Sequence, residues 1–117
     1  MANPFTHIEL NTTDVPKAKD FYSKLFAWEM EDLPMPYTMI KTGKGPGGGI
    51  IKNPMPGVPS FWLMYVEVDD IHAATKKAAS LGAKVVKEAV EVMDSGWLSI
   101  LADPTGAALG LWQPKPK

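Results

Sequence analysis

The sequence predicts an α+β fold made of two βαβββ modules, with the helices outside and curved mixed sheets that form a cup. Three observations support this prediction. Residues 5–28 read as a strand followed by a capped amphipathic helix, the same pattern returns 56 positions later (Asp14 to Asp70), and short strands follow both helices. In a chain of 117 residues we expect one domain, 1–117, with its repeats at about 5–52 and 61–112.

The first strand, residues 5–11, alternates between an apolar face and a largely polar face. The polar face carries Phe5, His7, Glu9 and Asn11. Thr12-Thr13-Asp14 then offers helix-capping side chains, and Pro16 suits the first helical turn because it needs no N–H donor there. The helix presents an apolar stripe that we expect to pack on the strand, made of Val15, Ala18, Phe21, Tyr22, Leu25 and Phe26. The polar face of the strand is then free to line a site.

The second module repeats this plan after a proline-rich linker at 53–60. The shift pairs Asp14 with Asp70, Val15 with Ile71, Ala18 with Ala74, Leu25 with Leu81 and Ala27 with Ala83. We expect further strands at 28–32, 37–42, 50–52, 61–68, 84–92, 97–102 and 107–112, and a second helix at 71–81. The order of strand, cap and amphipathic helix is preserved, which favours a true duplication.

A glycine-rich stretch, 43–49, contains the pattern GxGxxG. That pattern binds a dinucleotide only where a helix begins after it and receives the pyrophosphate, whereas here Pro46 interrupts and a strand follows. We therefore expect no dinucleotide site. The stretch is predicted to be a mobile hairpin loop beside the cup, able to act as a lid.

Composition narrows the class of protein. The net charge is −1 and the twelve basic residues are all lysines, which argues against nucleic acid as a partner. The sequence has no cysteine, no apolar run that could span a membrane and no secretion signal in its first residues. We expect a cytoplasmic protein without membrane partners.

The chain resembles the vicinal oxygen chelate superfamily, also called the glyoxalase, bleomycin resistance protein and extradiol dioxygenase superfamily. The resemblance is carried by His7, by Asp14-Val15, Phe21-Tyr22 and residues 25–28, and by residues 66–71, 81–83 and 103–106. It covers nearly the whole chain and implies this fold, with a site in the cup. It does not select one activity, because the fold hosts several chemistries and simple binders.

The resemblance also implies four positions for metal ligands, on the first and last strands of each half. This sequence fills them with His7, Leu63, Ile50 (or Gly49 if the register is shifted by one) and Gly110. Three of the four carry no donor atom, and Glu9 would raise the number of protein ligands only to two. The cofactor is unknown, and a divalent metal is not expected in the usual site.

His7 and Glu9 are the candidate catalytic residues, since an imidazole and a carboxylate can carry acid–base chemistry. The candidate ligand-binding residues are Tyr65, Leu63, Ile50, Gly110 and Trp112, which together predict a largely apolar, aromatic cup. Two simpler explanations stay open. His7 could be satisfied by a local hydrogen bond, and the aromatic residues, Phe21, Phe26 and Trp28 above all, could simply fill the core.

The favoured interpretation is a protein that binds a small organic molecule, with or without catalysis from a degenerate metal site. The alternatives are a non-catalytic protein that sequesters a drug, and a metal-dependent lyase or dioxygenase in which Glu9 supplements His7. As partners we expect the small-molecule ligand and a second copy of the chain, in a homodimer whose cup is built where two chains meet. Trp62, on the helix side of its strand, is the residue expected at that contact.

Overall fold

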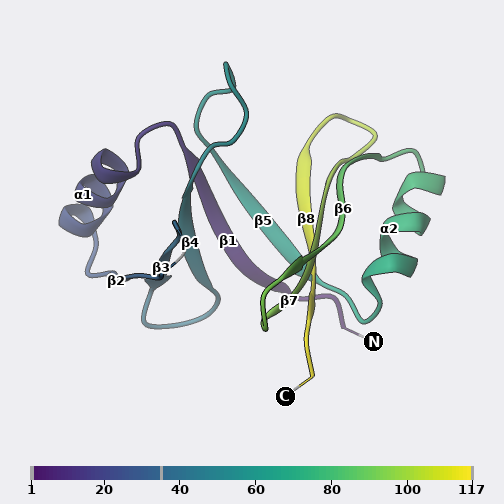
Figure 1. Cartoon of the computed structure of the whole chain (residues 1–117), viewed down its shortest axis with the longest axis horizontal. Coiled ribbons are helices and arrows are strands. Elements are labelled where there is room, and N and C mark those ends of the chain that lie inside the picture. Colours follow the sequence, from purple (N-terminus) through teal and green to yellow (C-terminus); the bar gives the residue numbers. More distant parts are fainter. Residues whose placement is uncertain (1, 35, 117) are drawn as a thin grey trace. The chain divides into compact units, whose positions relative to one another are not determined.

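The computed structural model describes residues 2–34 and 36–116 and confirms the α+β fold class (Figure 1). Its elements in chain order are β1 (Phe5–Thr12), α1 (Val15–Leu25), β2 (Glu29–Asp32), β3 (Thr38–Lys41), β4 (Gly47–Lys52), β5 (Phe61–Glu67), α2 (Ile71–Ser80), β6 (Lys84–Val92), β7 (Gly96–Ala102) and β8 (Ala108–Pro114). The strand-helix-strand-strand-strand order therefore occurs twice. No helix in the described part of the chain is long and apolar enough to cross a membrane.

The chain packs as two compact units, and their boundary does not coincide with the repeat boundary. One unit, the continuous unit, is His7–Leu63. The other, the divided unit, joins the residues up to Thr6 with those from Met64 onward. Within the divided unit the N–H of Glu67 donates to the carbonyl of Pro4 at 2.9 Å, and the Asn3 side chain donates to the carbonyl of Glu67 at 2.9 Å.

In the continuous unit the strands lie in the order β2-β3-β4-β1. β1 and β4 are parallel, and β3 is antiparallel to both its neighbours. Leu10, Ile40 and Ile50 form the buried core, against which α1 packs through Val15, Ala18 and Tyr22. The helix begins where the sequence indicates, since the Asp14 side chain accepts a hydrogen bond from the Lys17 N–H at 3.1 Å.

The predicted apolar stripe of α1 is only partly correct. None of the residues of α1, all of which the structure describes, is fully buried, and Phe21, Leu25 and Phe26 are exposed. The reason is geometric, because a helix turns 100° per residue and the stripe is wider than the surface that a sheet can cover. Phe21 and Phe26 therefore do not fill the core, contrary to the simpler explanation for these aromatic residues.

The glycine-rich stretch also differs from the expected loop. Gly47, Gly48 and Gly49 belong to β4, where they pair with His7, Ile8 and Glu9 of β1. Only the residues before them form the connection from β3. Glycine within a strand commonly marks a place where another group comes close to the backbone, and at Gly49 that group is the ring of Tyr37.

The linker after β4 is held at both ends. The N–H of Asn53 donates to the carbonyl of Thr12 at 2.8 Å, and the Asn53 side chain donates to the carbonyl of Val58 at 2.9 Å. The N–H of Thr13 donates to the Ser60 hydroxyl at 3.0 Å. These bonds fix residues 53–60 to the end of β1.

In the divided unit the strands lie in the order β5-β8-β7-β6, with β5 and β8 parallel. Its core contains Val68, Ile71, Leu101 and Leu111. The Asp70 side chain caps α2 by accepting from the Ala73 N–H at 3.0 Å. The two helices therefore begin at equivalent capping residues, as the duplication predicts.

Candidate functional site

The face of β1 that points away from the core carries a short polar row. His7, Glu9 and Asn11 alternate with Ile8 and Leu10, as the sequence predicts for a strand. Glu9 and Asn11 are both buried. The Asn11 side-chain amide donates to Oε1 of Glu9 at 3.3 Å, so one carboxylate oxygen of the buried glutamate has a donor within the strand.

Tyr37, just before β3, joins this row from across the sheet. Its hydroxyl lies 2.6 Å from Nε2 of His7 and donates to Oε2 of Glu9 at 3.1 Å. His7 and Glu9 are therefore brought together as predicted, but through a tyrosine hydroxyl that lies between them. The sequence prediction did not include Tyr37 among the site residues.

The hydrogen bonds around Tyr37 have a defined direction when Glu9 is ionised. A phenol carries one proton, and a carboxylate can only accept. The Tyr37 hydroxyl uses its one hydrogen in the bond to Glu9. Its oxygen must therefore accept the hydrogen bond from His7, which requires a proton on Nε2 of the imidazole. The series then runs from His7 through Tyr37 to Glu9, which also accepts from Asn11.

Burial lowers the pKa of His7 below its ordinary value of 6.5. The physical cause is desolvation, since removing the imidazolium from water costs more than removing the neutral ring. The neutral form is the one that can keep Nε2 protonated towards Tyr37 while retaining a basic nitrogen at Nδ1. The site thus favours a neutral imidazole with a fixed tautomer.

Gly49 makes room for Tyr37. A Cβ built on Gly49 would overlap the hydroxyl and the ring of Tyr37, so the ring occupies the place of a side chain on β4. Gly49 is also the direct partner of Glu9 in the parallel ladder. The glycine and the tyrosine together set the position of the hydroxyl against the polar row.

Ile50, expected on the site face, lies instead in the core. It is fully buried beside Leu10 and Ile40, on the helix side of the sheet. The register of β4 against β1 is shifted by one residue from the expected one, so Gly49 takes the place that the prediction gave to Ile50. A shift of one residue moves every side chain of a strand to the opposite face.

The divided unit repeats the arrangement of a glycine beneath an aromatic ring. Gly110 on β8 pairs with Tyr65 on β5, and a Cβ at Gly110 would overlap the Tyr65 ring. Trp112 lies two residues further along β8, and a Cβ at Gly96 of β7 would meet the Gln113 carbonyl first and then the Trp112 ring at 2.8 Å. Tyr65, Gly110 and Trp112 thus share one sheet face, as the alternation predicts.

The residues present do not fit the usual metal set of the resembled superfamily. Glu9 pairs with Gly49 on β4, and Tyr65, the equivalent of Glu9 in the second module (its repeat mate), pairs with Gly110 on β8. Neither glycine supplies a donor atom, and a tyrosine ring covers each of them. Leu63, the fourth position, is a buried apolar residue. Among residues 2–34 and 36–116, no three His, Asp or Glu side chains gather closely enough to hold a metal ion.

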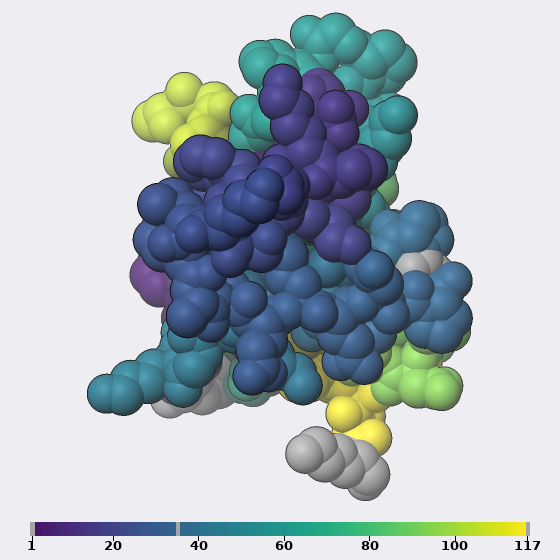
Figure 2. Space-filling model, turned by 90° about the vertical axis from the view of Figure 1, so that its left-hand side faces the viewer, coloured from purple at the N-terminus to yellow at the C-terminus, as the bar shows by residue number. Residues whose placement is uncertain are grey.

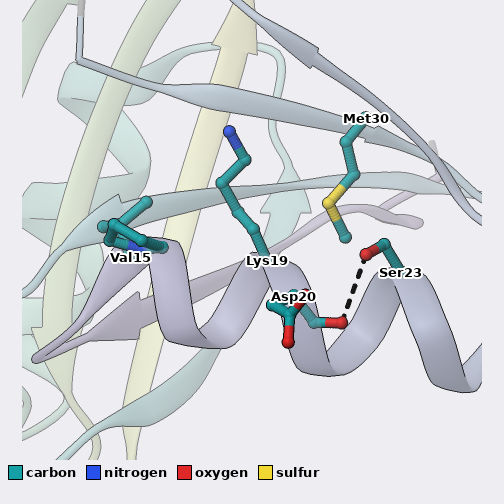
Figure 3. A pocket seen from close by; sticks show the side chains of 6 residues that line it. Val15, Lys19, Asp20, Ser23 and Met30 are labelled. Atoms are coloured by element: carbon teal, nitrogen blue, oxygen red, sulfur yellow. Dashed lines mark hydrogen bonds between the residues drawn. The ribbon is translucent and has the colours of Figure 1, made fainter.

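A separate surface groove of about 430 Å³ lies between α1 and β2 in the continuous unit (Figure 3). It is lined by Val15, Pro16, Lys19, Asp20, Ser23 and Met30. Lys19 is engaged there by Asp32 at 2.7 Å, and this hydrogen bond, aided by one from Thr38, lowers the pKa of the Asp32 carboxyl. The groove contains none of the predicted site residues.

Comparison with known proteins places these features in a family. The family model described as the Glyoxalase/Bleomycin resistance protein/Dioxygenase superfamily matches residues 5–111. The Mycobacterium bovis protein named "Putative glyoxylase CFP32" is 40% identical over 116 residues, covering 91% of this chain and 44% of that protein. The Streptomyces peucetius protein named "Anthracycline biosynthesis protein DnrV" is 30% identical over 128 residues, covering 90% of this chain and 45% of that protein. The chain therefore spans less than half the length of these curated relatives.

Solved structures support the same fold. The Mn(II)-bound glyoxalase from Novosphingobium aromaticivorans superposes with a TM-score of 0.67 at 14% sequence identity. The match covers 96% of this chain and 40% of that one. At this identity the likeness concerns the fold alone.

Proposed function

Because the chain belongs to the glyoxalase/bleomycin resistance protein/dioxygenase superfamily, we propose that it binds a small organic molecule at the polar row of β1, without the superfamily's usual metal set. The observation that carries the proposal is the hydrogen-bonded series of His7, Tyr37 and Glu9. These three polar side chains lie on one sheet face, and Gly49 leaves the space that the tyrosine ring fills. The packing of the sheet alone does not require such an arrangement. They offer donors and acceptors to a ligand oxygen.

The series has the residue types of acid–base chemistry. An imidazole held neutral by burial can accept a proton, and the phenol behind it links the ring to a carboxylate. The reaction class that suits such a base is proton transfer on a small molecule with a carbonyl or phenolic oxygen. The names of the relatives, a glyoxylase and an anthracycline biosynthesis protein, are consistent with ligands that contain carbonyl groups.

Sequestration without turnover is the second candidate function. It is favoured by the aromatic face of the divided unit, where the Tyr65 ring covers Gly110 and Trp112 lies on the same face of β8. Aromatic rings on a sheet face offer a stacking surface for a ligand without supplying acid–base chemistry. Tyr65, Leu63, Gly110 and Trp112 stay proposed ligand-binding residues, whereas Ile50, which lies in the core, is removed from the proposal.

The third interpretation, a metal-dependent lyase or dioxygenase, would need donors that the candidate positions do not supply. His7 and Glu9 are two ligands, and a catalytic divalent ion usually has three from the protein. We also retain, as parts of the proposal, a cytoplasmic location and a homodimeric state.

The experiment is a ligand screen with two readouts. Aromatic ketones, phenols and 2-oxo acids are added to ¹⁵N-labelled protein, and amide shifts are followed for the wild type, His7→Ala and Tyr37→Phe. We expect a hit whose affinity falls at least tenfold in His7→Ala, with the folded spectrum retained. His72→Ala is the matched control, since His72 is exposed in the first turn of α2.

Mass spectrometry of the ligand after incubation separates the two candidates. A changed mass or exchange of a carbon-bound proton for deuterium indicates catalysis, and an unchanged ligand indicates sequestration. If every hit binds His7→Ala and Tyr37→Phe as tightly as the wild type, the polar row is not the ligand site and the proposal is wrong.

A further inference from the structure

We infer that an aromatic face of α1 is the contact surface for a second copy of this chain. The inference is independent of the ligand site, because it concerns the helix side of the continuous unit, which faces the viewer in Figure 2. The surface, called here the aromatic patch, consists of Phe21, Leu25, Phe26 and Trp62. Their exposed fractions are 57%, 55%, 44% and 41%.

The patch is continuous, because Tyr22 joins its rings. The Tyr22 ring meets Phe21 edge-on at 4.9 Å between centroids and Trp62 edge-on at 5.5 Å, and it stacks with Phe26 at 6.5 Å. Apolar side chains scattered singly on a surface need no explanation, whereas a contiguous apolar patch of a few hundred Å² is often functional. Aromatic residues are also the type enriched in protein interfaces.

The duplication provides an internal control for this interpretation. At the positions of Phe21, Tyr22 and Phe26, the second module has Lys77, Ala78 and Gly82, and at the position of Trp62 the first module has Thr6. Both modules nevertheless form the same capped helix on the same kind of sheet. Tyr22 and Phe26 also pack on Trp28 within their own module. The exposed rings of Phe21 and Trp62 have no equivalent in the second module, so the fold of a module does not require them and an interaction is their physical reason.

The charges beside the patch fit a second copy of the same chain. Asp20 and Lys24 lie one helical turn apart next to Phe21, and both side chains are more than 60% exposed while they pair with each other at 3.0 Å. Two copies of α1 related by a two-fold axis across the helix run antiparallel. Near residue 22 such an axis sets Asp20 of each copy opposite Lys24 of the other, so the border of the patch is complementary to itself.

The apolar area of the patch is also large enough for a small specific interface between two copies of the chain. An aromatic side chain presents about 150–250 Å², so the exposed fractions correspond to roughly 400 Å² of apolar surface on each copy. Interfaces are somewhat more than half apolar. The implied contact is therefore roughly 650 Å² per copy, between the smallest specific interfaces and the standard size of about 800 Å².

The test is the mass of the protein in solution, measured by sedimentation equilibrium from low to high micromolar concentration. We expect the wild type to approach twice its chain mass of 12.7 kDa. Phe21→Lys and Trp62→Thr each introduce the residue that the other module has, and each should raise the dimer dissociation constant at least tenfold. Leu81→Lys is the matched control, because Leu81 is the repeat mate of Leu25 and is 69% exposed; it should leave the constant unchanged.

Charge reversal gives a second measurement that does not alter the apolar residues. Asp20→Lys and Lys24→Asp should each weaken the dimer, and the double variant should restore it because the facing charges are again opposite. This series decides the matter if Phe21→Lys or Trp62→Thr does not fold, as checked by circular dichroism. A wild type that stays monomeric overturns the inference, including the case in which another segment of a longer protein covers the patch. Dimerisation that none of these changes weakens overturns it as well.

Discussion

The ring of Tyr37 lies where a side chain at position 49 would be, so Gly49 and the tyrosine occupy one place on the sheet between them. Glu9 is the ladder partner of that glycine and accepts the hydrogen bond that the Tyr37 hydroxyl donates. The absence of a side chain at one strand position thus determines the geometry of three polar groups.

Gly49→Ala should displace Tyr37 and break its hydrogen bonds to His7 and Glu9. Because the new methyl group overlaps the end of the tyrosine side chain, the ring must rotate away. We expect a loss of about 1–3 kcal/mol in the free energy of unfolding, measured in urea, and a rise in the pKa of His7 as the ring becomes more exposed. Gly47→Ala is the control, since its methyl group would meet only the Ile40 carbonyl at 3.2 Å. Equal effects of the two changes would contradict this account.

The stability of the protein should depend on pH through His7. Its pKa is lowered in the folded state by burial, so between that pKa and 6.5 the unfolded chain binds more protons than the folded one. The contribution is complete above pH 6.5 and is lost as the pH falls towards the lowered pKa. Urea unfolding between pH 5 and 7.5 should show this loss in the wild type and a smaller one in His7→Gln. His72→Gln should retain the wild-type slope, and a slope that His7→Gln leaves unchanged would assign the effect elsewhere.

The purified protein should hold no stoichiometric transition metal. The reason is the set of side chains at the family ligand positions, where Gly49 and Gly110 lie under tyrosine rings and Leu63 has no donor. Elemental analysis of protein prepared without chelator should give far less than one zinc, nickel, manganese or iron per chain. Removal of trace metal with a chelator should also leave the melting temperature unchanged. About one metal per chain, lost in His7→Ala, would restore the metal-dependent interpretation.

Ser99→Ala should destabilise the divided unit. The fully buried Ser99 hydroxyl contacts the Thr75 hydroxyl at 2.7 Å and accepts from the N–H of Ala89 at 2.9 Å. Ala89 lies at an irregular point of β6 with φ at 45°, where no regular ladder partner takes its N–H. Loss of the Ser99 hydroxyl as acceptor should lower the free energy of unfolding by about 1–3 kcal/mol. Ser80→Ala, which removes an exposed hydroxyl at the end of α2, should change the free energy of unfolding by less than about 0.5 kcal/mol.

The sequence was sufficient to predict the module order and the positions of both helices. The Asp14 and Asp70 caps and the helical spacing that follows them are local signals, and the structure begins each helix one residue after its cap. The alternation of β1 likewise predicted that His7 and Glu9 share a face. These features depend on residues close together in the chain.

The register of β4 and the role of Tyr37 could not be predicted in the same way. Residues 47–49 were predicted as a loop because glycine weakens the interior of a strand. The place of Gly49 in the sheet is explained by the tyrosine ring that covers it. Tyr37 is thirty positions from His7, so no periodic pattern connects them. A run of glycines between two predicted strands, with a tyrosine at the start of the preceding strand, is the signal that could have indicated the pair.

The division of the chain into a continuous and a divided unit has a consequence for synthesis. Residues 7–63 form one compact unit, and since compact units generally fold as they are synthesised, we expect this unit to pack before the later segments are complete. The residues before this unit cannot, because the carbonyl of Pro4 has no bond to Glu67 until that residue has been made. Residues 3 and 4 are thus fixed only after a segment more than sixty positions later has been made. Removing them should impair the maturation of the divided unit and spare the continuous unit.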